Sequence, residues 1–214
     1  MITIHHLDNS HSHVAIWLLE ELALPYRIVH HARDPITSRA PETLRAIHPA
    51  GKAPTIEDHG MAMVESTGII LYIMDVYGAG RLRPSRNTPE AMQFFQWLTF
   101  LEGSAKGPLI QLARPASRPD DPARVATEQA VTTHLGLIET ALDQGQTIVP
   151  GSFTAADIQL GFFENVLEGL GRISAWPNMM AHLERMRGRE AYQRAEARGG
   201  PVSLKALLDP AARE

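Results

Sequence analysis

Two features of the stretch 51–75 are suited to holding a small ligand. Pro54 opens a short apolar strand, and a proline in that place leaves part of the strand edge unpaired. Glu65 and Ser66 follow a second strand, predicted over 61–64, where a helical pattern begins. A small polar residue there caps the helix, and the free N–H groups of the first turn favour an anion. An open strand edge beside a carboxylate-sized anion site predicts a place that binds one small peptide.

The elements that position this stretch alternate between strands and helices. Short β-leaning runs bounded by turn residues predict strands, and apolar residues at helical spacing predict helices. In chain order we predict a strand over 1–7, a helix over 13–24, a strand over 26–31, a short helix over 41–47, strands over 54–58 and 61–64 joined by a tight turn at His59-Gly60, and a helix from Glu65-Ser66 that is capped at Gly78. This order predicts a mixed sheet with helices packed on it.

The part of the chain after Pro89 is predicted to be helical. An aromatic-rich run predicts one long helix that is interrupted at Gly107-Pro108, and a further helix begins at Pro122 and continues to about Asp143. Thr154 and Asp157 occupy the N-cap and N3 positions of a capping box, with Asp in place of the usual Glu or Gln. We assign these two residues a role in folding and none in chemistry.

Composition divides the chain into two predicted domains. The sheet pattern covers 1–78, and the helical pattern covers 89–214. Between them, 79–88 is rich in Gly, Arg, Pro and Ser, which is typical of a linker. At 214 residues the chain has ample material for a hydrophobic core.

Bulk composition excludes several classes of function. The formal net charge of −4 and the lack of a basic run argue against nucleic acid as a partner. No apolar run is long enough to span a membrane, and the N-terminus has no signal pattern, so we expect a cytoplasmic protein without a membrane partner. The absence of cysteine excludes disulfides, zinc thiolates and a catalytic thiol within this chain.

Ten histidines raise the question of a metal site. The doublets His5-His6 and His30-His31 lie on predicted strands, where adjacent side chains point to opposite faces, so neither doublet chelates a metal by itself. The sequence also lacks HExxH or a similar spacing. We therefore predict no metal site.

A small mixed-sheet domain followed by an all-α domain with an ST-x-x-D box resembles the cytosolic glutathione S-transferase family. The resemblance covers nearly the whole chain and is carried by HHLDNSHSHVAIWLLEELALPY, HPAGKAPTIED, the ES pair, FTAADI and WPNMMAHLERMRGREAYQRA. It is strongest to a bacterial and fungal branch whose first loop reads roughly N-N-S-R-S. It implies the glutathione S-transferase fold: an α+β thioredoxin-like N-terminal domain (βαβ-α-ββα) followed by an all-α C-terminal domain. It also implies a homodimer that uses glutathione as cosubstrate.

The resemblance implies a role in glutathione binding for each polar residue of the stretch 51–75. Family members pair the cysteinyl backbone of glutathione with the residue before a cis-proline, which is Ala53-Pro54 here. Ser66 would hold the γ-glutamyl carboxylate, and Glu65 would hold the α-amino group through a charge-assisted contact. Lys52 would meet the glycine carboxylate.

The family's chemistry requires a thiolate, and the first loop implies which groups stabilise it. A thiol with a pKa of about 8.5 is only a few per cent ionised at neutral pH. By register with the N-S pair, Ser10 is the candidate hydrogen-bond donor to sulfur, and Asn9 is a second donor. Ser12 is a weaker candidate because it lies further along, and Ser10 has an alternative reading as a plain helix N-cap.

This chain departs from the family pattern at two positions near the sulfur. The loop arginine of the N-S-R-S form is His11 here, and a basic residue often found four positions after the serine is Val14. Both changes remove positive charge near the thiolate. Protonated His11 or His13 would compensate in part.

The leading hypothesis is a glutathione transferase that conjugates glutathione to hydrophobic electrophiles or reduces organic hydroperoxides, as in detoxification. We expect the electrophile pocket near Ser104 and the loop 114–122, with part of the aromatic run 94–100 in its wall. One alternative is a non-catalytic glutathione- or protein-binding module on the same fold, because fold alone does not determine function. A second alternative is a glutathione-dependent disulfide reductase.

Overall fold

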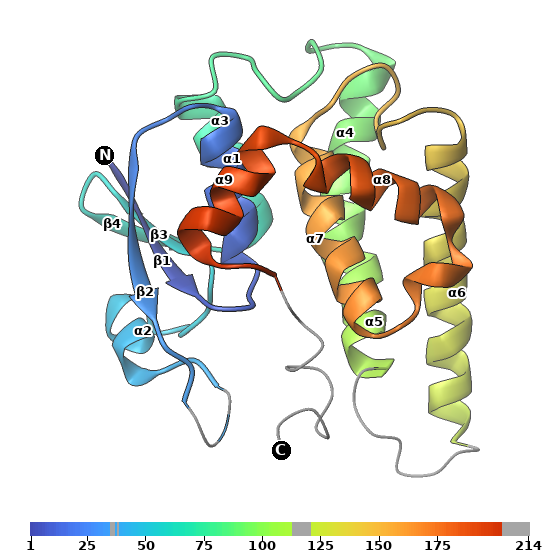
Figure 1. The fold of residues 1–214 in the computed structure, drawn as a ribbon, viewed down its shortest axis with the longest axis horizontal. Helices are drawn as coiled ribbons and strands as arrows, with labels where there is room; N and C mark the ends of the chain where they lie inside the picture. The colour runs from blue at the N-terminus through green and yellow to red at the C-terminus, as the bar shows by residue number, and fades with distance from the viewer. Residues whose placement is uncertain (35–36, 38, 113–120, 203–214) are drawn as a thin grey trace.

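The first part of the chain folds into a four-stranded mixed sheet (Figure 1). The structure, a computed structural model, describes residues 1–34, 37, 39–112 and 121–202. The strands are β1 (Ile2–Leu7), β2 (Tyr26–His31), β3 (Thr55–Asp58) and β4 (Met61–Val64), in the spatial order β2-β1-β3-β4. β1 runs parallel to β2 and antiparallel to β3, and β3 pairs antiparallel with β4. The helices of this part are α1 (Ser12–Glu21), α2 (Glu42–Ile47) and α3 (Ser66–Val76). This is the predicted βαβ-α-ββα order.

Local sequence explains the central strand and the hairpin. β1 is buried along its whole length, and its Ile4 pairs with Ile28 of β2 and Ile56 of β3. The turn between β3 and β4 is the predicted pair His59-Gly60, whose φ angles are +48° and +77°. Two successive positive φ angles match the right-handed twist of the flanking strands.

The second part of the chain is helical, as predicted (Figure 1). Its elements are α4 (Pro89–Phe100), the π-helix η1 (Leu101–Ala105), α5 (Lys106–Leu112), α6 (Pro122–Asp143), α7 (Ala155–Gly169), the 3₁₀ turn η2 (Ile173–Ala175), α8 (Pro177–Arg187) and α9 (Glu190–Gly199). The capping box is confirmed: the Thr154 N–H donates to Asp157 Oδ2 at 2.7 Å, and the Ala156 N–H donates to Thr154 Oγ1 at 3.3 Å.

Two predicted helix limits were wrong. The long helix is interrupted at the π-helix Leu101–Ala105, and α5 runs through Gly107-Pro108. The chain stays helical from the π-helix into α5, and Pro108 is the third residue of α5. The first helix ends at Glu21 and not at 24, because the chain turns left-handed at Ala23, whose φ is +50°.

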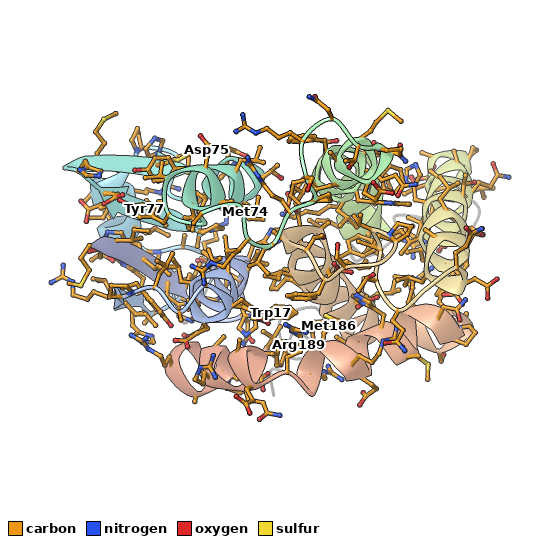
Figure 2. The ribbon with its side chains drawn as sticks, turned by 90° about the horizontal axis from the view of Figure 1, so that it is seen from above. Trp17, Met74, Asp75, Tyr77, Met186 and Arg189 are labelled. Atoms are coloured by element: carbon orange, nitrogen blue, oxygen red, sulfur yellow. The ribbon has the colours of Figure 1, made fainter. Side chains whose placement is uncertain are left out.

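α8 packs on α6 and α7, and α9 returns to the sheet side of the molecule and packs on α1 (Figure 1). Figure 2 shows Trp17 of α1 beside Met186 and Arg189. The Arg189 guanidinium donates to both carboxylate oxygens of Glu21, at 2.6 and 2.9 Å, and lies 3.5 Å from the centre of the Phe153 ring. Buried apolar side chains from both parts form one continuous core. These contacts hold the helical part against α1, which itself packs on β1 of the sheet.

The fold class is therefore the predicted one, a thioredoxin-like α+β unit followed by an all-α unit. The limits of 1–78, 79–88 and 89–214 stay a prediction. In the described part of the chain, no helix is both long and apolar enough to cross a membrane.

Candidate functional site

A cavity of about 310 Å³ lies between the loop before α1 and the helices η1, α5 and α7. Three of the residues predicted to form the site, Asn9, Ser10 and Ala53, line it. The remaining wall consists of His11, Leu101, Glu102, Lys106, Leu109, Ile110, Gln159, Phe162, Phe163 and Val166. The structure thus brings the first loop and the residue before Pro54 to one mostly apolar cavity.

Ser10 makes two hydrogen bonds to Ser12 within the first loop. Its Oγ lies 2.7 Å from Ser12 Oγ and accepts the Ser12 N–H at 3.3 Å. The N-cap of α1 is His11, but its side chain makes no capping hydrogen bond. The first N–H of the helix, that of Ser12, donates instead to Ser10, the residue before the N-cap. Asn9 has a φ of +51°, which turns the chain into this loop.

Ser12 connects the first loop to the interior. It is fully buried, and its Oγ lies 2.8 Å from His6 Nδ1 and accepts the Leu7 N–H at 3.3 Å. His6 is also buried, and its Nε2 lies 2.7 Å from the carbonyl oxygen of Gly199 at the end of α9. A chain of polar contacts thus runs from the cavity wall to the helical part.

The predicted glutathione-binding residues gather at the adjoining end of the sheet. The Ala53–Pro54 peptide is cis, as expected. Lys52 Nζ lies 3.6 Å from Glu65 Oε1, and both side chains are exposed. Ser66 Oγ lies 3.2 Å from His11 Nδ1. The N-cap of α3 is Glu65, with a φ of +77°, and not Ser66 as expected: Ser66 is the first helical residue, so its own N–H is among the unpaired donors.

His11 and His13 do not replace the lost positive charge. Burial lowers the pKa of His11, despite the nearby Glu102 carboxylate, and its ring stacks on Phe162 with centroids 4.5 Å apart. Burial lowers the pKa of His13 to about 3, and its ring packs edge-on against Tyr192 in the core. Both imidazoles are therefore neutral at neutral pH.

The charged pair in the cavity wall, Glu102 and Lys106, was not singled out in the sequence, although a helix was predicted there. Glu102 on the π-helix accepts from Lys106 Nζ at 2.9 Å, and its other oxygen lies 2.8 Å from His11 Nδ1. Burial raises the pKa of Glu102, but the hydrogen bond from His11 and the charge of Lys106 outweigh it and hold that pKa below its usual value. Lys106 Nζ also lies 2.9 Å from His11 Nδ1. Since that nitrogen is either a donor to Glu102 or an acceptor from Lys106, only one of the two contacts is a hydrogen bond at a time.

The sequence contains one pattern that could have indicated the Glu102–Lys106 pair. Glu102 and Lys106 stand four residues apart on a helix, the spacing of an ordinary surface ion pair. The π-helix that turns the pair toward His11 has no such local signature, although π turns occur often at functional sites.

The electrophile pocket stays a prediction, and the cavity lies only in part where we expected that pocket. The cavity is flanked by the helix that carries Ser104, but Ser104 itself does not line it, and 113–120 of the predicted loop lie outside the described residues. Phe94 and Phe95 of the aromatic run line a different groove, between α3 and α4.

One group of potential metal ligands occurs among the described residues. Ligand atoms of His6, Asp8 and His30 lie within 4.8 Å of one another, so one histidine from each doublet contributes. Both His6 nitrogens, however, are held by Ser12 and Gly199 in this structure.

Known proteins share parts of this chain's sequence and its fold. The family described as "Glutathione S-transferase, N-terminal domain" matches residues 4–81. Glutathione S-transferase 3 of Schizosaccharomyces pombe is 35% identical over 104 residues, which are 49% of this chain and 42% of that protein. The match thus spans less than half of that relative's length.

Two further proteins show how widely this fold is used. A solved glutathione S-transferase from Actinobacillus pleuropneumoniae superposes with a TM-score of 0.88 over 95% of both chains, at 29% identity. Elongation factor 1-gamma of Rattus norvegicus is 36% identical over 152 residues, 66% of this chain and 33% of that protein. Family profile, relatives and fold point the same way and support membership of this chain in the glutathione S-transferase family.

Proposed function

We propose that this protein is a glutathione transferase that activates glutathione as a thiolate and delivers it to a hydrophobic electrophile or an organic hydroperoxide. The observation that carries the proposal is the shared cavity: Ser10 and Ala53 line the same space as Phe162 and Val166. A peptide paired with Ala53 would place its thiol between the Ser10 loop and an apolar wall. An apolar cavity with a few convergent polar groups is typical of a small-molecule site.

The residues around the cavity suit the parts of glutathione in the order that the family implies. The helix start at Ser66 would take the γ-glutamyl carboxylate, and Glu65 would take the α-amino group. Lys52 would meet the glycine carboxylate after its 3.6 Å contact with Glu65 opens. Both Lys52 and Glu65 are exposed, so this exchange costs little.

Turnover with an aryl halide and with an organic hydroperoxide tests the proposal. We expect both reactions to exceed the uncatalysed rates, and Ser10→Ala to lower kcat/KM by about 10²-fold while the Kd for glutathione stays nearly unchanged. Ser152→Ala, at an exposed serine before α7, is the matched control. Rates equal to those without protein, for both substrates, would refute the enzyme. Full activity in Ser10→Ala would move the role in catalysis to Asn9.

The second candidate is a non-catalytic glutathione- or protein-binding module. The similarity to elongation factor 1-gamma favours it, because that protein is not named a transferase. Calorimetry separates the candidates: glutathione binding without turnover would indicate a glutathione-binding module. No heat at millimolar glutathione would refute the roles of Lys52, Glu65 and Ser66. A mixed-disulfide substrate tests the third candidate, the disulfide reductase.

We also propose a homodimer that forms through the groove between α3 and α4. The groove has a volume of about 590 Å³, and the apolar side chains Val76 and Phe95 in it are each 51% exposed. Asp75 and two arginines, Arg83 and Arg86, lie in the same groove. A surface that carries both apolar groups and opposite charges is suited to a two-fold contact with its own copy.

Size-exclusion chromatography with light scattering tests the dimer. We expect twice the chain mass for the wild type and a monomer for Phe95→Glu. Met180→Glu, which adds the same charge at an exposed methionine of α8, is expected to stay dimeric. A wild-type monomer would refute the proposal. The cytoplasmic location stays a prediction, and cell fractionation checks it.

A further inference from the structure

The contacts that run inward from Ser10 form one continuous chain of four groups. Ser10 Oγ lies 2.7 Å from Ser12 Oγ, Ser12 Oγ lies 2.8 Å from His6 Nδ1, and His6 Nε2 lies 2.7 Å from the Gly199 carbonyl oxygen. All three distances are those of well-formed hydrogen bonds. Ser12 and His6 are buried, so water does not compete for these bonds.

The far end of the chain determines the direction of every bond in it. A carbonyl oxygen only accepts, so His6 Nε2 carries the proton and donates to Gly199. Burial lowers the pKa of His6, although the bond to Gly199 works against this, so the resting imidazole is neutral. A neutral imidazole with a proton on Nε2 has none on Nδ1. Nδ1 therefore accepts from the Ser12 hydroxyl.

Ser12 in turn determines the direction of the Ser10 hydroxyl. The one hydroxyl proton of Ser12 is given to His6, so Ser12 Oγ accepts at its contact with Ser10. The alternative acceptor for that proton, the Leu7 carbonyl oxygen, is more distant, at 3.3 Å. Ser10 therefore points its hydroxyl proton inward. In this state it can accept a hydrogen bond from a thiol in the cavity, but it cannot donate one to a thiolate.

We propose that Ser10, Ser12 and His6 form a proton relay, in which His6 Nδ1 receives the proton that leaves the thiol of bound glutathione. This inference rests on the proposed function. The S–H bond breaks and its proton moves to Ser10 Oγ, the Ser10 proton moves to Ser12 Oγ, and the Ser12 proton moves to His6 Nδ1. One S–H bond is lost and one N–H bond is gained, and each serine ends with one proton. After these transfers, the donor and acceptor roles between Ser10, Ser12 and His6 are reversed, so Ser10 donates a hydrogen bond to the thiolate.

The surroundings of His6 are built to hold the ring in this orientation. A Cβ added at Gly199 would lie 2.8 Å from Ile16 Cδ1 and 3.4 Å from His6 Cε1, so glycine lets the end of α9 approach the ring without moving either side chain. Two charge partners act on the imidazolium with opposite sign: Asp8, whose Oδ1 lies 3.5 Å from His6 Nε2, favours it, and His30 disfavours it. Buried His13, from α1, remains neutral.

Ser12→Ala removes the middle of the relay and leaves Ser10 in the cavity wall. The ultraviolet absorbance of thiolate, followed against pH in the glutathione complex, reports the pKa of the bound thiol. We expect that pKa to rise by roughly one unit in Ser12→Ala, with about a tenfold loss of kcat/KM near pH 6.5 and an unchanged Kd for glutathione. We expect Ser12→Thr, which keeps the hydroxyl, to recover most of the loss.

Gly199→Ala breaks the far end of the relay without removing any of its side chains. We expect it to raise the pKa of the bound thiol in the same direction as Ser12→Ala, whereas Gly136→Ala, where nothing lies within 4 Å of an added Cβ, is the silent control. Thermal unfolding identifies any variant that fails to fold. A thiol pKa equal to that of the wild type in both folded variants would overturn the relay. Absence of glutathione binding to the wild type would overturn the proposed function itself.

Discussion

Two buried histidines of this protein differ in charge, although each is almost completely removed from water: one imidazole is neutral and the other is cationic. His6 lies between a serine hydroxyl and a carbonyl oxygen, and burial lowers its pKa. His182 on α8 lies between two carboxylates: its Nδ1 is 2.7 Å from Glu164 Oε2, and its Nε2 is 3.3 Å from Asp157 Oδ1. Burial lowers the pKa of His182, but the two carboxylates outweigh it and raise that pKa to about 9.

The difference shows that the partners of a buried imidazole, and not its burial, decide whether it carries charge. A neutral imidazole that accepts a hydrogen bond at one nitrogen can take up the proton of that bond, as a proton relay requires. A histidinium fixed between carboxylates neutralises buried charge, which suits a structural support. The capping-box residue Asp157 belongs to that support, since its Oδ1 also accepts the Ile148 N–H at 2.7 Å.

Replacing His182 is expected to have the largest effect. His182→Leu would leave two buried carboxylates without their cation, which costs about 3–5 kcal/mol of unfolding free energy. Urea unfolding measures the loss. Glu164→Gln is the matched control, because it keeps the shape and removes one charge, and we expect it to cost less. A loss below about 1 kcal/mol in His182→Leu would contradict a charged histidine at this position.

The protein should lose stability at high pH as His182 loses its proton. His6, whose pKa is lowered, is already neutral there. The folded-state pKa of about 9 lies above the usual histidine value of 6.5, so the contribution of His182 to stability is complete below pH 6.5 and is lost as the pH rises through about 9. The free energy of unfolding should fall by up to about 1.4 kcal/mol per pH unit in that window. Urea unfolding from pH 6.5 to 9.5 checks this. The double variant His182→Leu/Glu164→Gln is the baseline, because burial also raises the pKa of Glu164, to about 7, and that carboxyl would titrate in the same range. Parallel curves would contradict it.

His11 is an intermediate case that a single substitution can shift. It has one carboxylate neighbour, Glu102, and one cationic neighbour, Lys106, which lowers its pKa. Lys106→Met removes the cation and leaves the carboxylate, so we expect the pKa of His11 to rise, by less than the carboxylates raise that of His182. Imidazole NMR shifts against pH measure it, with Lys52→Met as the control at an exposed lysine. A fall in that pKa would contradict the electrostatic account.

Removing His30 is expected to have the smallest effect. Its ring meets that of His6 edge-on, with centroids 5.3 Å apart, and its charge lowers the pKa of His6. His30→Gln should therefore raise the pKa of His6 by a few tenths of a unit, since His30 is exposed and screened. NMR titration of His6 measures the change. A shift as large as one unit would mean that His30, and not burial, keeps His6 neutral.

Local patterns were sufficient for most of the fold. The strands Tyr26–His31 and Met61–Val64 and the helix Pro122–Asp143 begin and end where their apolar periodicity and their Pro and Gly residues predict. The capping box at Thr154 was predicted for the same reason, because its partner is three residues away. Interactions between residues a few positions apart can be predicted from the sequence, because both partners are visible in one short segment.

The candidate site was predicted only where its residues belong to a motif. Ser10 and Ala53 were expected together and do line one cavity, whereas Glu102 and Lys106 were not expected there. Their approach to His11 requires a π turn and the packing of two distant helices. The N-cap at Glu65 and the neutral state of His13 were missed for a related reason, since backbone turns and burial are set by neighbours remote in sequence.

The sequence by itself determined the fold class, the family resemblance and the polar groups available to a small peptide. Only the tertiary structure decided how those groups are connected. Ser12 looked like a weaker copy of Ser10, and His6 looked like half of a strand doublet. The carbonyl oxygen that gives both a direction belongs to Gly199, which is 193 residues from His6 along the chain. A hydrogen bond depends on the positions of its two atoms, and for atoms so far apart in sequence those positions exist only once the chain has folded.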